Sequence, residues 1–284
     1  MNDAAPGIAV ATALCRRVAW APAPRQSGAA TARWALLASL FLFVQTATAV
    51  EVLEDIVEQK YALDSDATLS ISNTDGSIRV YAHDVPEISI QAIKKAYSPG
   101  RLQGIVVDVK ATNKSVAINT IFPPRKNAVS DRSGTVDYIL VVPQTIRITQ
   151  LDLTNGEVLV EGLRGGSATA HLVNGWLGGH NCFGDLNLTV VNGRLDVAYD
   201  WWESQKFSVK ASSTSASLRA VLPSDAAVRI SARALTGRIA NAFETKKTQV
   251  NEVVHSLDTM IGPDPDAAFE MKADSGNIRI DKMY

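Results

Sequence analysis

The sequence predicts an all-β protein built as a single-domain parallel β-solenoid, either a right-handed β-helix or a β-roll. Three observations lead to this class. A short unit recurs at a spacing of about 19 residues, apolar and polar residues alternate within each copy, and a glycine stands in the middle. An antiparallel β-meander or sandwich is the alternative, because each glycine turn would also suit the corner of a hairpin.

The repeat is defined by six turn glycines: Gly76, Gly156, Gly175, Gly193, Gly237 and Gly276. The fifth residue before each glycine is apolar, and the second residue after it is leucine, isoleucine or valine. Each copy is therefore expected to be strand, turn and strand with one face buried. Asn, Asp, Ser or Thr precedes each glycine, as suits a tight corner. The segment 209–220 looks like a degenerate copy.

The repeat divides the chain after its leader into three regions of one domain, 50–284. These are irregular N-terminal strands and a loop at 50–148, regular repeats at 149–241, and irregular C-terminal coils at 242–284. Alternating residues within the first region predict strands at 88–97, 104–111 and 136–143. The polar, proline-containing stretch 123–134 is expected to be a protruding loop.

The first 49 residues have the three parts of a secretory signal peptide. Arg33 precedes the apolar run 34–44, and the small residues Ala47 and Ala49 follow it. The apolar run has 11 residues, whereas about 20 are needed to span a bilayer. We therefore expect cleavage after Ala49 and export to the periplasm or the cell surface.

Composition excludes several classes of protein. The chain has 28 basic and 29 acidic residues among its 284. Removal of the leader leaves a mildly acidic protein, so nothing favours nucleic-acid binding, which would show as a basic excess. Cys182 is the only cysteine after Ala49, so an internal disulfide is not expected and stability must come from packing.

The stretch 138–166, the VNG copies at 173–175 and 191–193, and the terminal copy 272–280 resemble a family of bacterial envelope proteins called putative adhesins. The resemblance covers roughly residues 66–283. It implies a β-solenoid fold, export and a surface or binding role. It supplies no catalytic residues.

No catalytic, cofactor or metal site is predicted. His171, His180 and Cys182 are the nearest approach to a metal site, but a structural zinc site normally needs four ligands and no second pair is visible. An exposed histidine position and a small buried thiol explain these residues better. The sequence also lacks the serine elbow of a hydrolase and the lysine of a phosphate-binding loop.

Trp176, Trp201 and Trp202 are the candidate partner-binding residues. Trp176 directly follows a turn glycine, in a column of polar residues, so it is expected to face outward, where an aromatic ring can stack on a sugar or a protein. In the structural alternative, Trp176 packs under a neighbouring loop while Trp201 and Trp202 close an edge of the core.

These observations favour an exported, non-enzymatic envelope protein whose repeat sheet binds a protein or a glycan. An envelope-stress or signalling component that binds a membrane partner is the alternative, and a polysaccharide-active enzyme is the third hypothesis. Contact with a membrane is expected only through an uncleaved signal segment. No oligomeric state is predicted.

Overall fold

The structure is a computed structural model that describes residues 51–124, 134–243 and 255–283. The chain divides into two units, residues 1–49 and 50–284, and the description that follows concerns the second. The predicted signal peptide and most of the predicted loop 123–134 lie outside the described residues. Within the described ranges, no helix has both the length and the apolar character that crossing a membrane requires.

The predicted all-β class is confirmed. Hydrogen bonds join all the strands into one sheet that contains both parallel and antiparallel pairs. In chain order, the strands are β1 (Leu53–Ala62), β2 (Thr68–His83), β3 (Glu87–Ala96), β4 (Val106–Thr112), β5 (Ser115–Ile121), β6 (Thr135–Pro143), β7 (Arg147–Glu161), β8 (Arg164–His180), β9 (Phe183–Ala198), β10 (Ser208–Pro223), β11 (Val228–Ala234), β12 (Ile239–Asn241), β13 (Ser256–Ile261), β14 (Ala267–Ala273) and β15 (Ile278–Met283).

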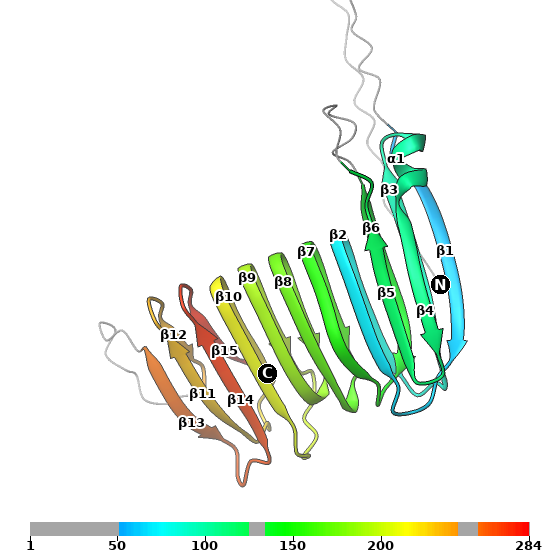
Figure 1. The fold of residues 1–284 in the computed structure, drawn as a ribbon. Coiled ribbons are helices and arrows are strands. Elements are labelled where there is room, and N and C mark those ends of the chain that lie inside the picture. Colours follow the sequence, from blue (N-terminus) through cyan, green and yellow to red (C-terminus); the bar gives the residue numbers. More distant parts are fainter. Residues whose placement is uncertain (1–50, 125–133, 244–254, 284) are drawn as a thin grey trace, which may run out of the picture. The chain divides into compact units, whose positions relative to one another are not determined.

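The regular copies form the long strands β2, β7, β8, β9 and β10, which lie side by side in parallel (Figure 1). Their turn glycines stand in register, with Gly156 paired to Gly76 and to Gly175, and Gly175 paired to Gly193. In the degenerate copy, Ala216 takes the glycine position beside Gly193. The repeat seen in the sequence is therefore a row of equivalent positions in space.

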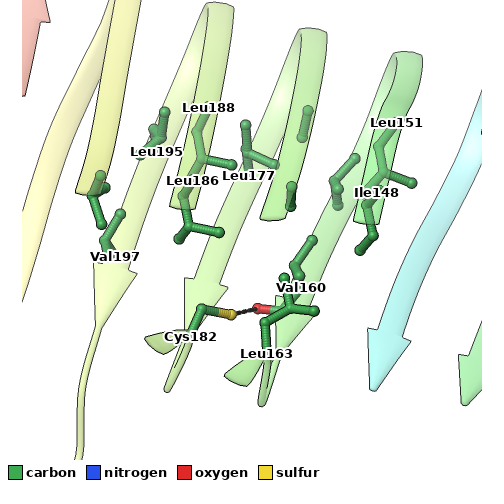
Figure 2. Close-up of a cluster of buried hydrophobic side chains, with 14 of the residues drawn as sticks. Ile148, Leu151, Val160, Leu163, Leu177, Cys182, Leu186, Leu188, Leu195 and Val197 are labelled. Carbon is green, nitrogen blue, oxygen red and sulfur yellow. Dashed lines mark hydrogen bonds between the residues drawn. The ribbon is translucent and has the colours of Figure 1, made fainter. Parts of the chain in front are cut away.

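Each long strand has two halves, and apolar side chains from both halves enter one core. The first half of β10 pairs with β14, and its second half pairs with β15. Figure 2 shows Leu186 and Leu188, from the first half of β9, pointing toward Leu195 and Val197 from its second half. All four side chains are buried. The strand bends at the glycine, whose φ is 127° in β9, and alternation on both sides of the bend then directs apolar side chains into one core.

The last two copies are exchanged in space relative to their order in the chain. β14 lies between β10 and β11, so the copy that contains Gly276 follows the degenerate copy directly. β13 pairs antiparallel with the other side of β11, and this strand leads back into β14. The sequence pattern could not show this exchange, because every copy presents the same alternation to its neighbours.

Strands predicted in the N-terminal region are present as β3, β4 and β6, and the pairs β1–β3 and β3–β6 are antiparallel. A short helix, α1 (Pro99–Gly104), was not predicted. Ser98 caps it, with its Oγ accepting a hydrogen bond from the backbone N–H of Arg101 at 3.3 Å. Pro99 occupies the first turn, where a missing N–H has no consequence.

Candidate functional site

The ends of the long strands form a second corner, where backbone hydrogen bonds join one copy to the next. The N–H of Gln144 donates to the carbonyl of His83 at 2.8 Å, and the N–H of Arg164 donates to the carbonyl of Gln144 at 2.8 Å. One copy further along, the N–H of Phe183 donates to the carbonyl of Leu163 at 2.8 Å. These bonds occupy several backbone donors and acceptors of the corner, which leaves the side chains as its main groups for recognition.

A hollow lies along this corner, and we call it the corner groove. It is lined by Tyr81, His83, Asp84, Gln144, Arg164 and Trp201, and its volume is about 260 Å³. His83, Asp84 and Gln144 also line an adjoining hollow of about 340 Å³, whose walls include Pro86 and Thr145. Because the two hollows share three lining residues, they lie next to each other, and we refer to both together as the extended groove.

Trp201 forms the wall of the corner groove at one end. It belongs to the connection between β9 and β10, and the residue remains 44% exposed. Its ring centroid lies 6.2 Å from that of Phe183, and its Nε1 donates a hydrogen bond to Oε1 of Glu203 at 2.9 Å. Neighbouring Trp202 is half-buried against the core. The two tryptophans thus differ in surroundings: one faces the groove and the other packs inward.

Arg164 and Glu203 hold this wall in place. Nη1 of Arg164 lies 2.6 Å from Oε2 of Glu203, and the Arg164 guanidinium lies 5.7 Å from the centre of the Phe183 ring. Burial opposes the ionisation of Glu203, but hydrogen bonds from Trp201 and Arg164 outweigh it and lower the pKa of this carboxyl. The positive charge of Arg164 is therefore already paired.

A second polar network flanks the groove and is centred on His180. Its Nδ1 lies 3.4 Å from Glu161, and its Nε2 lies 2.9 Å from Asp200. The buried amide of Asn181, a residue with a φ of 49°, donates to Asp200 at 3.0 Å and accepts from the Asp200 backbone N–H at 2.8 Å. Glu161 and Asn181 also line the groove. This network fixes the shape of the corner.

Other groove side chains have no protein partner. Across the ranges that the structure describes, the side chains of His83, Asp84 and Gln144 make no hydrogen bond or ion pair. His83 and Asp84 are exposed, and Gln144 is half-buried. Together they offer a ligand the Gln144 amide, which can donate and accept hydrogen bonds, the Asp84 carboxylate and the His83 imidazole.

Trp176 lies away from the corner groove, on the outer side of β8. Its Nε1 donates to Oδ2 of Asp196 at 2.6 Å, and the same oxygen accepts from Arg194. A Cβ on Gly178 would lie 2.6 Å from the Trp176 ring, so the ring lies flat over that glycine. The structure therefore does not bring Trp176 together with Trp201 and Trp202.

Among the residues considered as metal ligands, His180 belongs to the network described above and Cys182 is buried. The described residues contain no group of three or more His, Cys, Asp or Glu that could hold a metal ion. Sγ of Cys182 lies 3.3 Å from the carbonyl oxygens of Val160 and His180 (Figure 2 shows the first contact). His171 is half-buried and pairs with Asp152 and Thr189 in the sheet.

His83, Asp84 and Gln144 were not predicted as binding residues from the sequence. His83 ends β2, and Asp84 and Gln144 lie in short turns between strands. Residues 60 positions apart become neighbours only through the pairing of β2 with β6 and β7. Pro86 and Pro143, which stand beside these turns, were the local sequence feature that indicated them. Spacing within one repeat could not find a site that spans several copies.

The Cys182 thiol is expected to be unreactive in the folded protein. Burial raises its pKa to about 11, so at pH 8 its thiolate fraction is at least about a hundredfold lower than that of an exposed cysteine. Ellman's reagent should label a Cys15→Ser variant rapidly only after denaturation. Rapid labelling of the folded variant at the rate of a free thiol would contradict this burial.

Asp200→Asn is expected to lower the melting temperature at neutral pH and to matter less in acid. Hydrogen bonds from Asn181, then from His180, lower the pKa of Asp200. A lowered folded-state pKa contributes stability above the ordinary carboxyl pKa, about 3.9, and this contribution disappears as pH falls through the folded value. Circular dichroism melts should show the wild-type advantage shrinking below about pH 4. The exposed Asp274→Asn is the control, and an Asp200 effect that stays constant to pH 2 would oppose this explanation.

Comparisons with known proteins support the class that this geometry defines, an all-β protein with parallel, in-register repeats. No family model matches the chain, and no curated protein matches it. A solved structure of a putative cell adhesion protein from Clostridium sporogenes is similar, with a TM-score of 0.50 and 13% identity, covering 81% of this chain and all of that one.

Two further solved structures are named putative adhesins. The one from Bacteroides fragilis has a TM-score of 0.26 and 8% identity, covering 80% of this chain and 97% of its own. The one from Parabacteroides distasonis has a TM-score of 0.23 and 9% identity, covering 79% and 97%. Of these three structures, the Clostridium sporogenes protein is the one whose TM-score shows a likeness of fold.

Proposed function

We propose that this chain is an exported, non-enzymatic envelope protein that binds a partner through its repeat sheet and acts in adhesion, in the periplasm or at the cell surface. The observation that carries the proposal is the in-register parallel stacking of β2, β7, β8, β9 and β10. Such stacking repeats the same outward positions at intervals of about 4.8 Å, which creates a continuous surface.

The finer fold proposal is a β-solenoid in which each long strand and its connection make one coil. Parallel pairing of successive copies supports it, as do the equivalent glycines at one corner and the linked turns at the other. The antiparallel pairs β1–β3, β4–β5 and β11–β13 would then close the two ends. Covered ends are what a stack of sheets needs to avoid pairing with other chains.

An outward row at the glycine corner shows how regular the surface is. The side-chain amide of Asn155 donates to Asp75 at 2.8 Å, that of Asn174 donates to Asn155 at 2.9 Å, and that of Asn192 donates to Asn174 at 3.1 Å. All four residues share one position of the repeat, directly before the glycine. An exposed ladder of this kind keeps the surface polar and ordered.

Export is supported by the signal-peptide pattern of residues 34–49. Adhesion is supported by the fold shared with a protein that bears the name putative cell adhesion protein. When the full chain is produced in a bacterial host, the protein recovered from the periplasm or medium should begin at Val50. Retention in the cytoplasm with Met1 intact would overturn the export part of the proposal.

Binding is tested by incubating the purified, labelled protein with whole bacterial cells and with isolated envelopes, and measuring the fraction retained after washing. Trp176→Ala and Trp201→Ala are compared with the wild type to locate the binding surface. We expect saturable retention of the wild type and no release of reducing sugars from envelope glycans. An absence of saturable retention would overturn the binding role, and release of sugars would replace it with an enzymatic one.

A further inference from the structure

We infer that the corner groove is a binding site for a neutral oligosaccharide, with Trp201 as the platform on which one sugar ring stacks. This inference deepens the proposed function by naming the ligand class, and it rests on that proposal for its biological setting. Its physical basis is separate: an exposed aromatic ring, partner-free polar side chains and an extended hollow coincide at one corner of the fold.

The ring of Trp201 is suited to stacking because it is both exposed and held. Phe183 supports it at 6.2 Å between ring centroids, and Glu203 accepts the hydrogen bond of its Nε1 at 2.9 Å. A fixed ring loses little conformational freedom when a ligand binds. Its indole N–H is already satisfied, so what it offers is the π-face, which attracts the polarised C–H groups on the apolar face of a sugar.

Hydroxyl recognition falls to the partner-free side chains of His83, Asp84 and Gln144. A sugar hydroxyl is both a donor and an acceptor, so it matches an amide, a carboxylate and an imidazole equally well. These three residues are shared by both hollows. They therefore lie where the two hollows adjoin, and a chain of several sugars that occupied both hollows would cross them.

The charges that line the groove favour a neutral ligand over an acidic one. Arg164 is paired with Glu203 at 2.6 Å, whereas the Asp84 carboxylate has no cationic partner within the described part of the chain. An acidic polysaccharide would meet an unpaired carboxylate and a cation that is already neutralised. A peptide strand is also less suited, because the backbone groups of the corner are bonded to each other.

The test measures binding of defined hexasaccharides to the protein made from the full chain, by isothermal titration and by tryptophan fluorescence. Maltohexaose, cellohexaose and chitohexaose are the neutral probes, and hexagalacturonate is the acidic one. We expect at least one neutral probe to bind, more tightly than its disaccharide because the groove is extended. Trp201→Ala should weaken that binding at least about tenfold.

Trp176→Ala is the matched control, because that ring lies on the outer side of β8. This variant should bind the oligosaccharide with the affinity of the wild type. Gln144→Ala and Asp84→Ala leave the core untouched and should each weaken binding several-fold, so they decide the matter should Trp201→Ala fail to fold. The inference is overturned when no neutral probe binds at 10 mM, about the weakest affinity of interest. Tighter binding of hexagalacturonate, or unchanged affinity in Gln144→Ala and Asp84→Ala, would also overturn it.

The outcomes separate this inference from the proposed function. Retention on cells without binding to any neutral hexasaccharide would leave the adhesion role standing and remove the oligosaccharide site. Binding to a neutral hexasaccharide without retention on cells or envelopes would establish the site and remove the adhesion role.

Discussion

Replacing Gly175 with alanine is expected to lower the free energy of unfolding by about 2 to 5 kcal/mol, one of the two largest effects that the fold predicts for a single substitution. Two causes combine. Gly175 has a φ of 135°, which L-residues rarely adopt, and a Cβ would lie 1.9 Å from the carbonyl oxygen of Gly156 in the neighbouring copy. Alanine can be accommodated only when the two copies move apart, and that movement would break the register on both sides.

Gly165→Ala separates the two causes. Gly165 also has a positive φ, 70°, but a Cβ built there meets no atom within 4 Å. Its cost should be about 1 to 2 kcal/mol, from backbone strain alone. Chemical denaturation followed by circular dichroism gives both values. Equal losses in the two variants would mean that the close approach of neighbouring copies does not constrain the glycine column.

The glycine column also explains why so much of the fold could be predicted. Period-2 alternation and one fixed glycine per copy are local properties, and the structure keeps them in register from Gly76 to Gly193. Even the degenerate copy was identifiable, because Val209 and Leu218 keep the alternation around Ala216. Where the backbone geometry repeats, a single sequence shows the residue pattern that this geometry requires several times.

Prediction was weaker where contacts are non-local. The position of β14 between β10 and β11 depends on which copies of the repeat pair with each other. The sequence does not specify this pairing, because each copy has an equivalent edge. The corner groove depends on turns from five different connections, none of which carries a repeat signal. Of the predicted binding residues, the structure places Trp201 in the groove and Trp176 elsewhere.

The groove and the core are physically connected through one aromatic cluster. Phe183 lies at its centre, with ring centroids of Tyr199 at 5.2 Å, Phe207 at 5.8 Å and Trp201 at 6.2 Å. Tyr199 is fully buried and donates its hydroxyl to the carbonyl of Cys182 at 2.7 Å. The aromatic residues, few in the chain as a whole, are concentrated where the connection between β9 and β10 crosses the end of the core.

Phe183→Ala is therefore expected to reduce the free energy of unfolding by about 3 to 5 kcal/mol, because it removes a buried ring and leaves a cavity among other rings. Phe183→Leu keeps most of the volume and should cost less than about 1.5 kcal/mol. Both values come from chemical denaturation monitored by circular dichroism.

The same pair of variants tests whether the core positions the groove. Phe183 supports both Trp201 and the Arg164 guanidinium, so its loss frees the wall of the groove as well as the core. We expect Phe183→Ala, measured below its melting temperature, to broaden and red-shift the tryptophan fluorescence. It should also weaken any oligosaccharide binding. Phe183→Leu should keep most of the stability but lose part of the support that the Phe183 ring gives to Trp201. A stability loss without a change in tryptophan fluorescence would show that Phe183 does not position the wall, and the groove would then be independent of the aromatic cluster.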